Sequence, residues 1–214
     1  MSGATDDLNF IHRFEPAAEG GRALTLLLLH GTGGNESDLL DVGRMIAPDA
    51  ALLSPRGKVL ENGMPRFFRR LSEGVFDEED LKARTEELAE FIDAAAGTYG
   101  MDRESILAVG YSNGANIAAS LLLSDPEMLA GAILFKPMTP FQPDALPNLS
   151  RKPIFMAAGR QDPIVPPENT ERLAAMLRDA GASVTLEWLA ESHGLTQEEI
   201  QAAAGWLAVF PGSS

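Results

Sequence analysis

The stretch Ile106-Leu-Ala-Val-Gly-Tyr-Ser-Asn-Gly-Ala-Asn-Ile-Ala-Ala-Ser-Leu-Leu-Leu123 decides the fold. Its apolar first part predicts a buried strand that ends at Gly110, and its second part predicts a helix that starts at Ser112. Between them lies the pattern Gly-x-Ser-x-Gly at 110–114, which in a sharp strand-to-helix turn strains the serine and raises its hydroxyl above the sheet. Ser112 is therefore a candidate nucleophile. The alternative is an ordinary glycine-rich turn.

Short apolar runs alternate with amphipathic segments along the rest of the chain. The runs are Leu24–Leu29, Ala51–Leu53, Ile106–Val109, Ala132–Phe135, Ile154–Ala158 and Val184–Trp188. Uninterrupted apolar runs of this length suit strands that are buried on both faces. Helical patterns lie between them: one around 81–95, one that ends at Gly181, and one opened by a capping box of Thr196 and Glu199. We therefore predict an α/β fold, a doubly wound and mostly parallel sheet with helices on both faces.

Size and composition bound the function. The 214 residues, of which 45% are apolar, suit a single domain over 1–214 with a flexible segment at 1–8. The formal net charge of −14 disfavours binding to nucleic acids and to anionic membranes. The sequence contains no cysteine, which excludes disulfides, thiolate metal sites and a cysteine nucleophile. The first ten residues do not resemble a secretory signal, so we expect a cytoplasmic protein, either a monomer or a homodimer.

A serine nucleophile needs a base, and the sequence offers three histidines. His12 lies in a polar stretch before the first apolar run. His30 opens a glycine-rich loop and has another expected role there. His193 follows the last apolar run and precedes the last predicted helix, which places it at the same sheet edge as Ser112. Elimination therefore favours His193 as the general base, against the alternative of a surface histidine.

The base needs a carboxylate that orients its ring. Asp162 follows the apolar run 154–158 in a proline-rich loop, and Asp144 is the competing candidate in the segment before it. Asp162 is preferred because the order Ser112, Asp162, His193 matches that of α/β-hydrolases. The alternative for Asp162 is a simple Asp-Pro turn.

The loop His30-Gly-Thr-Gly-Gly34 directly follows the first central strand. Its glycines allow backbone N–H groups to turn inward, and a tetrahedral intermediate needs two such donors at its oxyanion. We predict the N–H groups of Thr32 and Asn113 as this pair. A phosphate-binding loop is the alternative, but the lysine and serine or threonine of a P-loop are missing. His30 is expected to brace the loop through hydrogen bonds.

The segment 55–78 has no clear periodicity, which is typical of a lid or binding loop. Its aromatic residues Phe67, Phe68 and Phe76 are predicted to form an apolar wall over Ser112, with burial in the core as the alternative. Further residues predicted to line the acyl pocket are Met138, Phe141 and Leu195.

The same segment carries Arg66, Arg69 and Arg70. These arginines either attract an anionic group of the substrate or pair with the acidic cluster at 77–80, and the second interpretation is slightly favoured. No insertion between predicted strands is long enough for a large cap domain, so we expect a fairly open site.

Four motifs in order, HGTGG at 30–34, GYSNG at 110–114, GRQDPIVP at 159–166 and SHG at 192–194, resemble the phospholipase/carboxylesterase family of α/β-hydrolases. That family includes bacterial carboxylesterases and acyl-protein thioesterases, and the likeness runs from about Leu24 to Phe210. It implies the α/β-hydrolase fold, with no metal and no organic cofactor. The segment 54–77 also looks like a bacterial subgroup linked to quinone and catechol stress.

The resemblance implies a serine carboxylesterase that hydrolyses small to medium acyl esters through an acyl-enzyme. An acyl-thioesterase or lysophospholipase with the same triad is the alternative. Thioesterase members typically carry glutamine after the nucleophile, whereas Asn113 stands here, which disfavours lipidated proteins as substrates. A catalytically silent binding protein is a further alternative, although the intact serine, histidine and aspartate argue against it.

Overall fold

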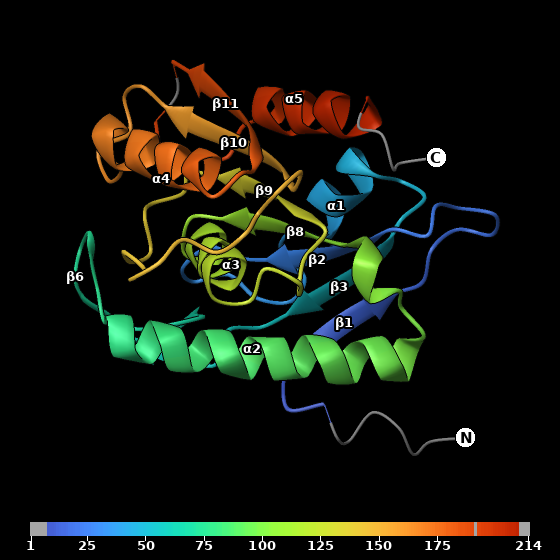
Figure 1. The fold of residues 1–214 in the computed structure, drawn as a ribbon. Helices are drawn as coiled ribbons and strands as arrows, with labels where there is room; N and C mark the ends of the chain where they lie inside the picture. Colours follow the sequence, from blue (N-terminus) through green and yellow to red (C-terminus); the bar gives the residue numbers. More distant parts are fainter. Residues whose placement is uncertain (1–7, 191, 210–214) are drawn as a thin grey trace.

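The central element of the computed structural model, which describes residues 8–190 and 192–209, is a seven-stranded sheet (Figure 1). Its strand order is β1-β3-β2-β8-β9-β10-β11, and only β1 runs antiparallel to its neighbour. The strands are β1 (His12–Glu15), β2 (Thr25–Leu29), β3 (Ala51–Pro55), β8 (Ile106–Tyr111), β9 (Gly131–Phe135), β10 (Pro153–Gly159) and β11 (Ser183–Leu189).

Five helices cover both faces of this sheet. They are α1 (Leu40–Ile46), α2 (Glu78–Tyr99), α3 (Asn113–Ser124), α4 (Pro167–Asp179) and α5 (Gln197–Ala208), and a short 3-10 turn, η1 (Arg103–Ser105), precedes β8. The helices α2, α3 and α4 contribute to one hydrophobic cluster, whereas α1 and α5 contribute to a second cluster on the opposite face (Figure 1). These three layers confirm the predicted doubly wound, mostly parallel fold.

All six predicted apolar runs are strands, but the sequence reasoning missed β1 and α1. The strand β1 has four residues at the sheet edge, where its side chains are only half buried or exposed, so it has no apolar run. The helix α1 has seven residues and no side-chain cap at its N-terminus. Of the predicted flexible segment 1–8, only Leu8 is described, and it is buried in the core. The other seven lie outside the described residues.

The segment 55–78 is not the unpatterned loop that we predicted. It forms two hairpins, β4 (Val59–Glu61) with β5 (Met64–Arg66), and β6 (Arg70–Ser72) with β7 (Val75–Phe76). The first hairpin turns at Asn62-Gly63, both at positive φ, a sequence that favours the tight two-residue turn. Figure 1 shows the β6 hairpin beside the start of α2. Short strand pairs, rather than a helical cap, therefore make up this segment.

Both glycines of the Gly-x-Ser-x-Gly turn are required by close backbone contacts. A Cβ atom on Gly114 would lie 1.9 Å from the carbonyl oxygen of Leu29 in β2. A Cβ on Gly110 would lie 2.6 Å from the backbone of Ala115. The first turn of α3 therefore packs directly onto β2, and this contact fixes the position of Ser112 between them.

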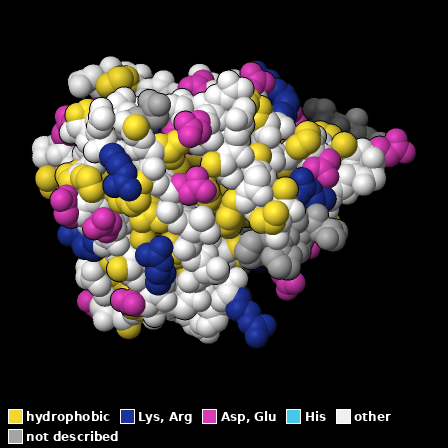
Figure 2. All heavy atoms as spheres, turned by 90° about the horizontal axis from the view of Figure 1, so that it is seen from above, with side chains coloured by type: hydrophobic (Ala, Val, Ile, Leu, Met, Phe, Trp, Pro, Cys, Tyr) yellow, Lys and Arg dark blue, Asp and Glu magenta, His cyan; other side chains and the backbone are white. Residues whose placement is uncertain are grey.

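The surface carries charges of both signs. Figure 2 shows acidic and basic side chains scattered over the face seen from above, with hydrophobic side chains between them. Within 8–190 and 192–209, none of the helices is both long and apolar enough to cross a membrane.

Two glycine substitutions in helices test the packing of α3 on β2. We expect Gly114→Ala to lower the free energy of unfolding by about 3 kcal/mol or more, because the new methyl group meets backbone atoms that cannot move aside. Gly97→Ala in α2 is the matched control, since nothing lies within 4 Å of its Cβ. It should raise the free energy of unfolding by roughly 0.5–1 kcal/mol. Equal effects in urea denaturation would contradict the packing argument.

Candidate active site

Ser112 lies between β8 and α3 in a strained conformation. Its φ of 52° and ψ of −112° are rare for a residue with a side chain and cost about 1–3 kcal/mol. Its N–H donates to the carbonyl of Phe135 at the end of β9, at 2.9 Å. The neighbouring strand therefore helps to hold the turn in which the hydroxyl is presented.

The structure brings Ser112, His193 and Asp162 together in one hydrogen-bonded chain. His193 Nε2 lies 2.9 Å from Ser112 Oγ, and His193 Nδ1 lies 2.8 Å from Asp162 Oδ2. The side chain of Asp162 is 1% exposed, and its Oδ1 accepts from the N–H groups of Ile164 and Val165. The carboxylate is thus fixed from two sides, and the ring presents Nδ1 to the carboxylate and Nε2 to the serine.

The competing residues lie elsewhere. Asp144 is exposed and has no partner among the described residues. His12 sits in the edge strand β1, where its ring nitrogens meet the carbonyl of Phe10 and the hydroxyl of Tyr99 at 2.7 Å each. The geometry therefore favours Asp162 over Asp144 and leaves His193 as the histidine beside Ser112.

The loop that carries His193 is tied to β8. Tyr111 Oη donates to the carbonyl of His193 at 3.1 Å, and the two rings lie 5.8 Å apart. Burial, with Asp162 and Glu199 nearby, raises the pKa of the Tyr111 phenol above its ordinary value. The phenol therefore stays protonated and keeps its donor.

His30 braces the glycine-rich loop, as expected. Its Nδ1 lies 2.7 Å from the carbonyl of Gly31, and its Nε2 accepts from the N–H of Gly57 at 3.0 Å. Burial lowers the pKa of His30 below its ordinary value, so the ring is neutral and serves as donor at one nitrogen and acceptor at the other. His30 thereby joins the loop at 30–34 to the segment 55–78.

The two residues predicted to supply the oxyanion donors, Thr32 and Asn113, line the same pocket as Ser112. In the described part of the chain, the backbone N–H groups of Thr32 and Asn113 donate to no protein acceptor. The side chains of the same two residues accept hydrogen bonds: Thr32 Oγ1 accepts from Arg66 Nη1, and Asn113 Oδ1 accepts from the N–H of Phe67, both at 2.7 Å. Both backbone donors thus remain available to a ligand.

A pocket of about 300 Å³ opens over Ser112 and His193. Met138 lines it, as predicted, and so does Phe76. Phe67 and Phe68 do not: they are 2% and 0% exposed and belong to the core, so their predicted place in the pocket wall is wrong.

Two further predicted pocket residues lie in neighbouring hollows. Leu195 borders a separate hollow beside Gly31 and Leu39, and Phe141 borders another near α4. The corrections share one reason. Proximity in sequence to the turn or to the base does not tell which side of a backbone faces the pocket.

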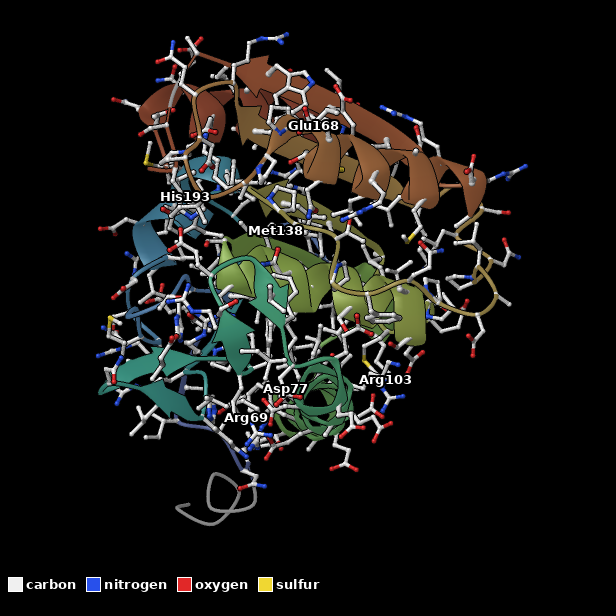
Figure 3. The ribbon with its side chains drawn as sticks, turned by 90° about the vertical axis from the view of Figure 1, so that its left-hand side faces the viewer. Arg69, Asp77, Arg103, Met138, Glu168 and His193 are labelled. Carbon is white, nitrogen blue, oxygen red and sulfur yellow. The ribbon has the colours of Figure 1, made fainter. Side chains whose placement is uncertain are left out.

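The three arginines of the hairpins divide into two groups. Arg69 pairs with Asp77 and Asp80 at the start of α2, as the favoured interpretation expected. Arg66 and Arg70 instead pair with Glu61 and line the pocket. Figure 3 shows Arg69 beside Asp77, well away from His193 and Met138.

Sequence reasoning missed a buried ion pair below the site. Lys136 Nζ and Glu199 Oε1 lie 2.5 Å apart, and both side chains are fully buried. The contact is an ion pair rather than a well-directed hydrogen bond. Glu199 also accepts through Oε2 from the N–H of Thr196, at 2.9 Å. The only available signal was a lysine directly after an apolar strand.

No group of three or more histidine, aspartate or glutamate side chains within 8–190 and 192–209 is arranged to hold a metal ion. His193 and Asp162 are instead engaged in the hydrogen bonds described above. Their arrangement suits activation of the serine hydroxyl by an imidazole.

The sequence model of the phospholipase/carboxylesterase family matches residues 17–210. The chain belongs to this family. A curated relative, the putative hydrolase MhqD of Bacillus subtilis strain 168, is 58% identical over 181 residues, which cover 85% of this chain and 90% of that protein. Membership of the family supports an enzyme that hydrolyses carboxylic esters.

Solved structures of the family agree with this assignment. The Bacillus cereus carboxylesterase is 50% identical, with a TM-score of 0.90 and 94% of each chain covered. A carboxylesterase from Mesorhizobium loti is 30% identical, with a TM-score of 0.88 and coverage of 97% of this chain and 98% of that one. The predicted α/β-hydrolase fold and family are thereby confirmed.

The buried ion pair gives a stability prediction. Lys136→Met leaves the Glu199 carboxylate buried and unpaired, so we expect the free energy of unfolding to fall by about 3–5 kcal/mol. The double variant Lys136→Met/Glu199→Gln removes both charges, and the side-chain oxygen of the glutamine can still accept from the N–H of Thr196 in the capping box. This variant should regain most of the lost free energy of unfolding.

The control is Arg103→Met, which breaks an exposed pair with Asp93 and should cost no more than about 1 kcal/mol. Denaturant unfolding of the three variants measures these differences. A double variant as unstable as Lys136→Met would show that the buried carboxylate is not the cause.

Proposed function

We propose that this protein is a serine carboxylesterase that acts through an acyl-enzyme on small to medium acyl esters. The observation that carries the proposal is the continuous hydrogen-bonded chain from Ser112 through His193 to Asp162, of which Ser112 and His193 line a pocket. In this arrangement a serine hydroxyl has both a base and an orienting carboxylate. A catalytically inactive binding protein would have no need for a serine, a histidine and an aspartate in one hydrogen-bonded chain.

Acylation begins when Ser112 Oγ attacks the ester carbonyl while His193 Nε2 takes its proton. Negative charge then develops on the carbonyl oxygen, and the N–H groups of Thr32 and Asn113 are the donors proposed to receive it. The N-terminal end of α3 adds its positive dipole at the same place. His193 next protonates the leaving alcohol, and the acyl group stays on the serine.

Deacylation repeats the sequence with water. His193 takes a proton from water, which attacks the acyl carbonyl, and the proton then returns to Ser112 Oγ as the acid leaves. Asp162 keeps Nδ1 protonated and stabilises the imidazolium in both halves of the reaction. The two N–H groups that hold its Oδ1 keep this carboxylate in position.

The pocket supports a small substrate rather than a phospholipid or a lipidated protein. Its volume of about 300 Å³ lies at the lower end of ligand pockets, and the β4–β7 hairpins stand beside it. The same triad would also cleave a thioester. The preference for small esters over lipidated proteins therefore rests on the size of the pocket and on Asn113, which stands where thioesterase members typically carry glutamine. We expect a small-molecule ester as partner, and no nucleic acid.

Labelling with a fluorophosphonate tests the nucleophile. The reagent should modify the wild-type protein at one site, and mass spectrometry should locate it on the peptide that contains Ser112. Ser112→Ala should lose the label and the hydrolysis of p-nitrophenyl esters. Labelling that survives this substitution would overturn the assignment, whereas a wild-type protein that is neither labelled nor active would support the silent alternative.

A pair of Asp→Asn variants tests the acid. Asp162→Asn should keep the fold but favour the wrong tautomer of His193, and turnover should fall by up to roughly 10⁴. Asp144→Asn is the matched control because Asp144 is exposed, and its turnover should equal that of the wild type. Both are assayed on one short-chain ester at neutral pH. A crippled Asp144→Asn would refute the role of Asp162.

A further inference from the structure

Two arginines line the pocket beside Ser112, in a protein whose net charge is −14. Arg66 comes from β5, and its side chain is only 4% exposed. Arg70 comes from β6, and its side chain is 28% exposed. Arginine is seldom buried unless it is paired, so the partners of these side chains decide what they do.

One carboxylate serves both guanidinium groups. Glu61 lies 2.9 Å from Arg70 Nε and 3.1 Å from Arg66 Nη1. Glu73 also borders the pocket, but it is exposed at the turn of its hairpin, where water and salt screen it. The remaining cation of the pocket wall, Lys136, is matched by Glu199. The two arginines therefore carry one positive charge that no buried carboxylate neutralises.

Several donors of this group have no protein partner. Arg66 donates from Nε to the carbonyl of Phe68 and from Nη1 to Thr32 Oγ1, but its Nη2 donates to none of the described residues. Arg70 uses only Nε. Unpaired donors in a pocket wall are the feature that an acceptor-rich ligand satisfies.

The electrostatics of Arg66 agree with this arrangement. Burial, reinforced by the charge of Arg70, holds the pKa of the Arg66 guanidinium below its ordinary value, and Glu61 compensates only in part. The guanidinium stays charged because arginine does not deprotonate in proteins. The negative charge around the Arg66 guanidinium is therefore too small to compensate its positive charge, and a bound anion would complete the compensation.

We propose that Arg66 and Arg70 form a subsite for a carboxylate carried by the ester substrate. This inference rests on the esterase function proposed above. The planar fork of a guanidinium matches a carboxylate in two parallel hydrogen bonds. Met138, Ile164 and Val165 line the same pocket, so the substrate is a small ester with one apolar part and one anionic part.

Matched pairs of esters test the subsite. The first pair is mono-p-nitrophenyl adipate and p-nitrophenyl hexanoate, which differ by a carboxylate at the end of the acyl chain. The second pair is 4-acetoxybenzoate and 4-acetoxybenzamide, which place the carboxylate on the alcohol side. The wild type should prefer the anionic member of at least one pair by about tenfold or more in kcat/KM, the size expected for a charge-assisted hydrogen bond.

Three variants assign the preference to the pocket. Arg66→Met and Arg70→Gln should each lower the ratio of kcat/KM for the anionic over the neutral ester, while the other arginine still pairs with Glu61. Glu61→Gln should raise the ratio because it removes the competing carboxylate. Arg69→Gln changes the net charge equally but lies at Asp77 and Asp80, away from the pocket, and should leave the ratio unchanged (Figure 3).

The outcomes separate this inference from the proposed function. Hydrolysis of both members of each pair without preference, or a preference that survives in both arginine variants, would overturn the subsite and leave the esterase intact. Equal losses for both members in Arg66→Met and Arg70→Gln would also overturn it, since those arginines would then only support the fold of the site. If the wild type cleaves none of the four esters, the esterase proposal itself fails.

Discussion

At Gly114 the backbone of α3 passes so close to the carbonyl of Leu29 that no side chain fits between them. This contact sets the angle at which α3 leaves β8, and hence the strained backbone of Ser112. It also brings the turn next to the loop at 30–34, which follows β2 directly. The proposed nucleophile and the proposed oxyanion donors are thus neighbours because two backbones are in contact, whatever the side chains contribute.

A second set of contacts links the turn of Ser112, the proposed nucleophile, to the loop of His193, the proposed base. The carbonyl of Phe135 accepts from the N–H of Ser112, and the N–H of Lys136 donates to the carbonyl of Ala157. The peptide between Phe135 and Lys136 therefore joins the ends of β8, β9 and β10. The side chain of Lys136 then runs to Glu199, which caps α5 next to the loop of His193. A buried charge is strongly destabilising unless an opposite charge pairs with it. The end of β9 and the start of α5 are therefore held together at this place.

The sequence predicted the parts of the protein that local pattern governs. Continuous apolar runs located the six parallel strands, and strand-end loops located Ser112, Asp162 and His193, because parallel strands bring those loops to one edge. It failed where the outcome depends on packing between distant segments. Phe67 and Phe68 belong to the core, and the N–H of Phe67 donates to Oδ1 of the buried Asn113, a contact between segments 46 residues apart. The partition of the arginines between Glu61 and the start of α2, likewise, follows from hairpin registers that apolar periodicity does not report.

The bond from the Phe67 N–H to Asn113 Oδ1 has a consequence for access. It fastens the segment between the two hairpins to the residue that follows Ser112, and His30 fastens the same segment to the glycine-rich loop through Gly57. A cover that swung open as a hinged flap would pull on both proposed oxyanion donors at once. Any opening of the hairpins would therefore change the geometry of the proposed oxyanion site, so the proposed esterase requires the hairpins to keep this position during the reaction.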